Sequence, residues 1–141
     1  MKNLTLVIPA KKESESLAKV LNELKPYNLK KIIVLEKKDK KTINSIKKFK
    51  KNILFQKNQG YGDALTLGIR NVKTKYFCIF NADGSFNPNE LNNMLSTLIN
   101  KKKDIIFASR YQDNASSDDD TLTTYVGNKI FSLIGKIFFG L

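Results

Sequence analysis

Five short, largely apolar runs constrain the fold of this chain more than any other feature of its sequence. They cover residues 4–8, 31–35, 52–55, 76–80 and 104–109, and they are typical of strands buried on both faces. Between them, apolar residues recur at helical spacing over residues 13–24, 42–49, 64–72 and 88–98. Such strands, alternating with amphipathic helices, indicate a parallel sheet with helices on both faces. We therefore expect an α/β fold with an open, doubly wound and mostly parallel sheet.

The chain is strongly basic, which bears on the kind of partner it binds. Its 141 residues include 25 lysines and arginines against 13 acids, for a formal net charge of +12. This charge favours a polyanionic partner such as nucleic acid, an anionic membrane surface or a phosphorylated ligand. Arg70 and Arg110 are the only arginines, and the guanidinium group is the usual reader of bases. We expect no nucleic-acid partner, although a basic nucleic-acid-binding domain stays an alternative.

Histidine and cysteine usage narrows the chemistry that the chain can perform. No histidine is present, which excludes histidine general bases, catalytic triads and histidine metal ligands. Cys78 is the only cysteine, so no disulfide forms within the chain, and a reducing compartment fits. The apolar run before Pro9 is too short for a signal peptide or a membrane span. We expect a cytoplasmic protein whose chemistry rests on carboxylates, amides, lysines and the backbone.

Polar residues gather where the predicted strands end. The five strands end in or run on to PAKKE, LEKKD, NQGYG, NADGS and SRY. In open α/β sheets, ligands bind at the carboxyl ends of the strands. These segments are therefore the candidate site, and several carry side chains able to bind a sugar, a phosphate or a metal.

Two long segments resemble a known enzyme family. VIPAKKESESLAKVL resembles the opening of glycosyltransferase family 2, and NQGYGDALTLGIRNVKTKYFCIFNADGSFNP resembles its middle, where an Asp-x-Asp-Gly-Ser motif follows an apolar strand. ASRY and YVGNKIFSLIGKIFFG look like the branch that contains dolichol-phosphate mannose synthase and other polyprenyl-phosphate glycosyltransferases. The resemblance implies a GT-A-like fold and inverting transfer of a sugar from a nucleotide-diphosphate-sugar to an acceptor such as a polyprenyl phosphate. It also implies one nucleotide-sugar-binding domain over residues 1–141, truncated at its C-terminal end.

The NADGS segment carries the metal site that the resemblance implies. Asp83 would hold Mg²⁺ or Mn²⁺ against the diphosphate, with Asn81 and Ser85 as further ligands and Asp83 also as a catalytic residue. Asn81 stands where the family motif has an aspartate, so the site has one negative charge fewer. The alternative is that Asn81, Asp83 and Gly84 only form a turn before the next helix.

Other residues are implicated by their match to the family. The resemblance assigns Arg110 to a phosphate of the donor or acceptor as a second catalytic residue, and an exposed arginine without a function is its alternative. Glu13 is equally well explained as an acid near a helix N-terminus. The alternative for Gly60 and Gly62 is that they allow the helix to start and to pack closely on the sheet. The expected donor-binding residues are Pro9, Ala10, Glu13, Glu36, Gly60, Gly62 and Ala82.

The last segment, residues 128–140, is apolar almost all round the predicted helix. A helix of this kind is buried or lies in an interface, and it is too short to cross a bilayer. Together with Lys129 and Lys136 it could bind the cytoplasmic face of an anionic membrane, near a lipid-linked acceptor. A core or dimer helix is the alternative. For the whole chain, a non-catalytic nucleotide-sugar-binding or partner module of the same fold stays open beside the enzyme.

Overall fold

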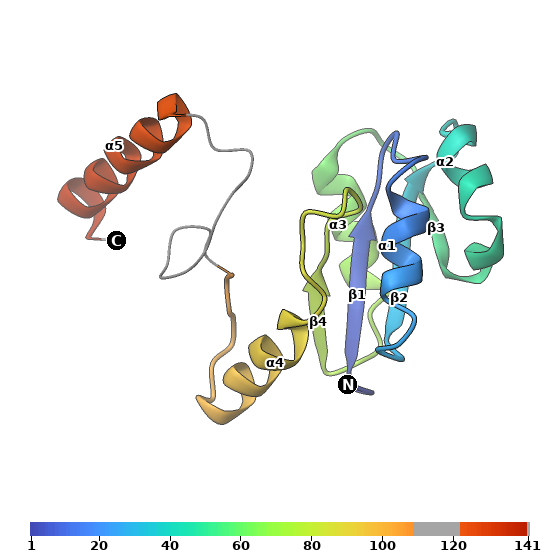
Figure 1. Ribbon diagram of the computed structural model, residues 1–141, viewed down its shortest axis with the longest axis horizontal. Helices are drawn as coiled ribbons and strands as arrows, with labels where there is room; N and C mark the ends of the chain where they lie inside the picture. The colour runs from blue at the N-terminus through green and yellow to red at the C-terminus, as the bar shows by residue number, and fades with distance from the viewer. Residues whose placement is uncertain (109–121, 141) are drawn as a thin grey trace. The chain divides into compact units, whose positions relative to one another are not determined.

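The computed structural model describes residues 1–108 and 122–140, in two units that span residues 1–101 and 102–141 (Figure 1). A four-stranded sheet forms the first unit, with every adjacent pair of strands parallel and the order β3-β2-β1-β4. The strands are β1 (Leu4–Pro9), β2 (Lys30–Glu36), β3 (Ile53–Gln56) and β4 (Tyr76–Ile79). This architecture confirms the expected α/β class and the parallel sheet.

Helices cover both faces of this sheet (Figure 1). The first face carries α1, which packs beside α2, and the opposite face carries α3, which contacts β1, β2 and β3. The helical elements of the first unit are α1 (Leu17–Glu23), α2 (Lys40–Ser45), the 3₁₀ segment η1 (Lys47–Asn52), α3 (Tyr61–Arg70) and α4 (Glu90–Asn100).

Alternate residues of the central strands serve the two faces. Leu6 and Ile8 of β1 are fully buried in a cluster with the apolar residues of α1. Val7, between them, points to the other face, where α3 approaches so closely that a Cβ added at Gly68 would lie 2.4 Å from Val7 Cγ1. The same Cβ would lie 3.2 Å from Val34 Cγ2 of β2. Gly68 is therefore the residue that lets α3 pack directly on the sheet.

Two sequence predictions differ from the structure. The helix predicted over residues 42–49 is divided, because Ile46 leaves helical geometry between α2 and η1, and Phe49 kinks the chain within η1. The strand predicted over residues 104–109 is wrong, since residues 104–108 form no strand and residue 109 lies outside the described residues. Ile105 and Phe107 are 67% and 86% exposed. An apolar run becomes a strand only where a neighbouring strand pairs with it, and these residues have none within the described part of the chain.

The second unit contains α5 (Leu122–Phe139), which begins six residues before the predicted segment. It carries Lys129 and Lys136 and no acid. Among the side chains of α5 that the structure describes, the exposed large apolar ones are Val126, Ile130, Phe131, Leu133, Ile134, Ile137 and Phe138. Among the residues that the structure describes, no helix combines the length and apolarity needed to cross a membrane.

Candidate functional site

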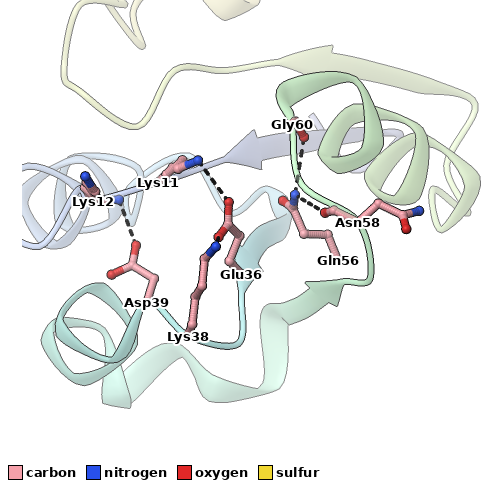
Figure 2. A network of polar contacts seen from close by, with 8 residues as sticks. All are labelled: Lys11, Lys12, Glu36, Lys38, Asp39, Gln56, Asn58 and Gly60. Atoms are coloured by element: carbon pink, nitrogen blue, oxygen red, sulfur yellow. Dashed lines mark hydrogen bonds and ion pairs between the residues drawn. The ribbon is translucent and has the colours of Figure 1, made fainter.

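The parallel strands bring the predicted site segments to one edge of the sheet. In register, Pro9 of β1 lies beside Val34 of β2, and Glu36 of β2 lies beside Gln56 of β3. Polar contacts join the loops that leave β1 and β2 there, and the loop that leaves β3 has polar contacts of its own (Figure 2). The carboxyl end of β4 lies at the same edge because β4 is parallel to β1. Segments far apart in sequence thus form one candidate site, as the rule for open α/β sheets predicts.

The NADGS segment folds into a tight turn after β4. Asp83 Oδ1 accepts a hydrogen bond of 2.9 Å from the backbone N–H of Ser85, and Asn81 Nδ2 donates to Ser85 Oγ over 3.1 Å. Gly84 has a φ of 89°, a backbone conformation that residues with a Cβ atom rarely adopt. The structure therefore brings the three predicted metal ligands together, and it also forms the turn that was the alternative explanation.

The oxygen atoms of this turn are of the right type for a hard divalent ion, but they supply only part of its ligands. A carboxylate, an amide carbonyl and a hydroxyl are oxygen ligands of the kind that Mg²⁺ and Mn²⁺ take. The turn supplies one negative charge, and among residues 1–108 and 122–140 no three histidine, cysteine, aspartate or glutamate side chains gather to hold a metal. Such a set fits an ion whose remaining ligands are water and the oxygens of a diphosphate.

Glu36, at the end of β2, is buried and paired with two lysines (Figure 2). Its Oε1 lies 3.1 Å from Lys11 Nζ and its Oε2 lies 3.0 Å from Lys38 Nζ. The hydrogen bond from Lys38, and after it that from Lys11, lowers the pKa of Glu36 below its ordinary value, against the opposing effect of burial. Both lysines are more than half exposed, so ammonium groups cover the carboxylate that was expected to contact the base or ribose.

The end of β1 is held by the sheet and leads to Glu13. Pro9 and Ala10 are buried, and the N–H of Ala10 donates to Val34 O over 3.0 Å, which extends the pairing with β2 by one residue. Glu13 is half-buried before α1, and its Oε2 accepts a hydrogen bond from Ser16 Oγ. The structure thus places Glu13 at the helix start, where its alternative explanation also puts it.

The two predicted glycines lie at the start of α3. Gly60 precedes the helix with a φ of 114°, and its carbonyl accepts a hydrogen bond of 3.3 Å from Gln56 Nε2. No atom lies within 4 Å of a Cβ built at Gly60 or Gly62, so close packing of helix on sheet is made at Gly68 instead. Asp63, in the first turn, accepts hydrogen bonds from the N–H and the side-chain amide of Asn58.

Two further predicted residues differ in their surroundings. Ala82 is 5% exposed and packs in the main apolar cluster, next to the turn that holds Asp83. Arg110 lies outside the residues that the structure describes. A shallow depression of about 280 Å³ lies between α1 and the turn and is lined by Glu15, Lys19, Asp83 and Gly84, among others.

Comparison with known families decides what kind of domain this is. Residues 5–138 match the family described as glycosyl transferase family 2. The chain belongs to glycosyl transferase family 2. The four-stranded parallel sheet and its flanking helices are consistent with the Rossmann-like GT-A fold of this family.

Two curated relatives are similar over most of this family 2 chain. The uncharacterized protein MJ1222 of Methanocaldococcus jannaschii is 27% identical over 128 residues, which cover 87% of this chain and 53% of the relative. The UDP-N-acetylglucosamine–dolichyl-phosphate N-acetylglucosaminyltransferase of Methanococcus voltae is 26% identical over 155 aligned positions, covering 94% of this chain and 62% of the relative. The chain thus spans between half and two thirds of the length of these proteins. No solved structure gives a significant match.

Three residues of the family 2 domain were not among the sequence-predicted site residues: Lys11, Lys38 and Asp39. The side chain of Asp39 accepts hydrogen bonds from the N–H of Lys12 over 2.7 Å and from the N–H of Thr42 over 3.2 Å. Its spacing before the 42–49 helix is a helix-capping signal that could have identified its local role. Its bond to Lys12, 27 residues away, has no signature in the sequence.

Proposed function

We propose that this family 2 domain binds a nucleotide-diphosphate-sugar at the carboxyl edge of its sheet and transfers the sugar to an acceptor. The observation that carries the proposal is the turn of residues 81–85, in which Asp83, Asn81 and Ser85 are joined by hydrogen bonds at the end of β4. A carboxylate at this edge of a parallel sheet lies where ligands of open α/β folds bind. Family membership supports a nucleotide-sugar donor.

Each site residue has a role in this proposal. Asp83, with Asn81 and Ser85, would hold Mg²⁺ or Mn²⁺, and the bound ion would supply the positive charge that neutralises the departing diphosphate. The backbone of Gly60 and Gly62, at the start of α3, gives a ligand close access, because neither glycine has a neighbour within 4 Å of its Cβ direction. Pro9, Ala10, Glu13, Glu36 and Ala82 complete the donor site, and Arg110 would bind a phosphate.

For the acceptor we propose a polyprenyl phosphate. The Methanococcus voltae relative is named as a transferase that acts on dolichyl phosphate, which supports a lipid phosphate here. A phosphate is already anionic near neutral pH, so its attack on the sugar needs no general base, in contrast to a hydroxyl acceptor. The exposed apolar side chains of α5, together with Lys129 and Lys136, suit a helix that lies on an anionic membrane surface near such an acceptor.

One observation favours a second function, a nucleotide-sugar-binding module without catalysis. Asn81 replaces the first carboxylate of the family motif, so the turn of residues 81–85 carries only the charge of Asp83. A weaker metal site would lower the rate of transfer more than it lowers binding, because the ion acts mainly on the charge that develops as the diphosphate leaves. Binding and transfer therefore have to be measured separately.

Calorimetric titration with UDP and with GDP, each with and without Mn²⁺, tests binding. Hydrolysis of UDP- and GDP-sugars over several hours tests catalysis. We expect metal-dependent binding of at least one nucleotide and slow donor hydrolysis. Binding without hydrolysis would support the module, and the absence of binding to both nucleotides would contradict the donor site altogether.

A further inference from the structure

The loops that follow β1 and β2 are joined by two charged contacts at adjacent positions (Figure 2). Lys11 Nζ pairs with Glu36 Oε1 over 3.1 Å, and the backbone N–H of Lys12 donates to Asp39 Oδ2 over 2.7 Å. The second contact is a short hydrogen bond to a charged acceptor, the kind that is strongest in proteins. Because it fixes a backbone group, it restrains the path of the chain itself and not only a side chain.

Lys12 has a backbone conformation that makes such a restraint necessary. Its φ is 61°, in the left-handed region that residues other than glycine, asparagine and aspartate rarely adopt. Among the described residues of the candidate site, Lys12 is the only residue other than glycine that has a positive φ. The bond to Asp39 fixes the N–H of Lys12 beside the start of α2, and it thereby restrains the loop in which this conformation occurs.

The Asp39 carboxylate is itself held firmly in place. Its Oδ1 accepts the N–H of Thr42 over 3.2 Å, and its backbone carbonyl accepts the N–H of Ile43 over 3.1 Å, so that it is the N-cap of α2. Burial raises the pKa of Asp39, but the hydrogen bonds from Lys12 and Thr42 outweigh this effect and lower it below its ordinary value. The carboxylate is therefore ionised near neutral pH and positioned by α2.

We propose that Asp39 is a positioning residue that holds the loop between β1 and α1 in the conformation needed to bind the donor. This inference rests on the proposed function, since residues 10–13 of that loop include the expected donor-binding residues Ala10 and Glu13. Asp39 acts through the backbone of Lys12 and does not itself have to touch the ligand. Without its bond, Lys12 would relax toward negative φ and turn the following residues away from the site.

Asp39→Asn tests this role while it keeps the helix cap. Asparagine caps helices about as well as aspartate, so we expect its single acceptor oxygen to keep the bond from Thr42, while the bond from Lys12 and the charge are lost. We expect UDP or GDP to bind about five- to tenfold more weakly, because only a fraction of the molecules keeps the competent loop. Calorimetry in the presence of Mn²⁺ measures the change.

Rescue at position 12 separates positioning from a general loss of stability. Lys12→Gly in the Asp39→Asn background should restore the dissociation constant to within about threefold of the wild-type value, because glycine adopts positive φ at no steric cost. Lys12→Ala in the same background removes the same ammonium group without this freedom and should not restore binding. Equal affinity of the Gly and Ala double variants would overturn the inference.

A readout without ligand separates the failure of the inference from the failure of the proposed function. The amide proton of Lys12, followed by NMR, should be shifted downfield and slow to exchange in the wild type, and should lose both properties in Asp39→Asn. An amide that does not change would overturn the inference even if nucleotides bind. If the wild type binds neither UDP nor GDP while the amide responds as expected, the proposed function fails. The result then shows that Asp39 holds the loop, without a role in donor binding.

Discussion

At the scale of single residues, the proposed function depends most directly on the charge of the turn after β4. Asp83→Asn should abolish most of the metal-dependent part of nucleotide affinity and leave the fold intact, because Asp83 is exposed at a strand end. Asn81→Asp should act in the opposite direction and tighten Mn²⁺ or Mg²⁺ binding by on the order of 1 kcal/mol, since it adds a second charge to a solvated site. Titrations with nucleotide, with and without metal, measure both effects. If neither substitution alters the metal dependence, Asp83 is only a turn residue.

Glu36 provides a second test at this scale, through the pH dependence of stability. Its pKa is lowered in the folded protein by Lys38 and Lys11, so its contribution to stability is present above its unfolded pKa of about 4.3 and is lost as the pH falls through the lower folded value. Urea unfolding at pH 7 and pH 3 should show a smaller loss of stability for Glu36→Gln than for the wild type. Glu23→Gln, on the exposed side of α1, is the matched control and should keep the wild-type difference.

At the scale of elements, the contact of α3 with the sheet depends on one glycine. Gly68→Ala would place a methyl group 2.4 Å from Val7 Cγ1, and overpacking of this kind typically costs about 1–3 kcal/mol. Gly62→Ala, in the same helix with no atom within 4 Å of the added methyl, should instead be neutral or stabilise by up to about 1 kcal/mol. Thermal or urea unfolding of both variants compares the two sites. Equal changes in stability for the two variants would contradict the close approach at Gly68 as the cause of the difference.

At the scale of the whole molecule, the net charge of +12 and the exposed apolar residues of α5 bear on where the protein acts. If α5 lies on a membrane surface, the protein should sediment with vesicles that contain anionic lipid and remain in solution with neutral vesicles. Replacing Phe131, Ile134 and Phe138 by serine should abolish sedimentation, because most of the apolar contact is then lost. Circular dichroism checks that the variant stays folded. Equal sedimentation of the two proteins would contradict a membrane role for α5.

The sequence by itself determined the elements of the first unit and the edge of the sheet at which a site could form. Apolar runs, helical spacing and glycine or proline at element ends are local signals, and they predicted β1 to β4, the helices between them and the NADGS turn. They also identified the family, because its motifs consist of residues close together in the chain.

Only the tertiary structure decided which residues meet across that edge. Three contacts join separate segments: the ion pair of Lys11 with Glu36, the bond from Lys12 to Asp39, and the approach of Gly68 to Val7. The strand predicted at residues 104–109 is wrong for the same reason, since no strand among the described residues pairs with residues 104–108. Local propensity fixes what a segment can become, whereas pairing, close approach and charge neutralisation depend on what another segment brings to it.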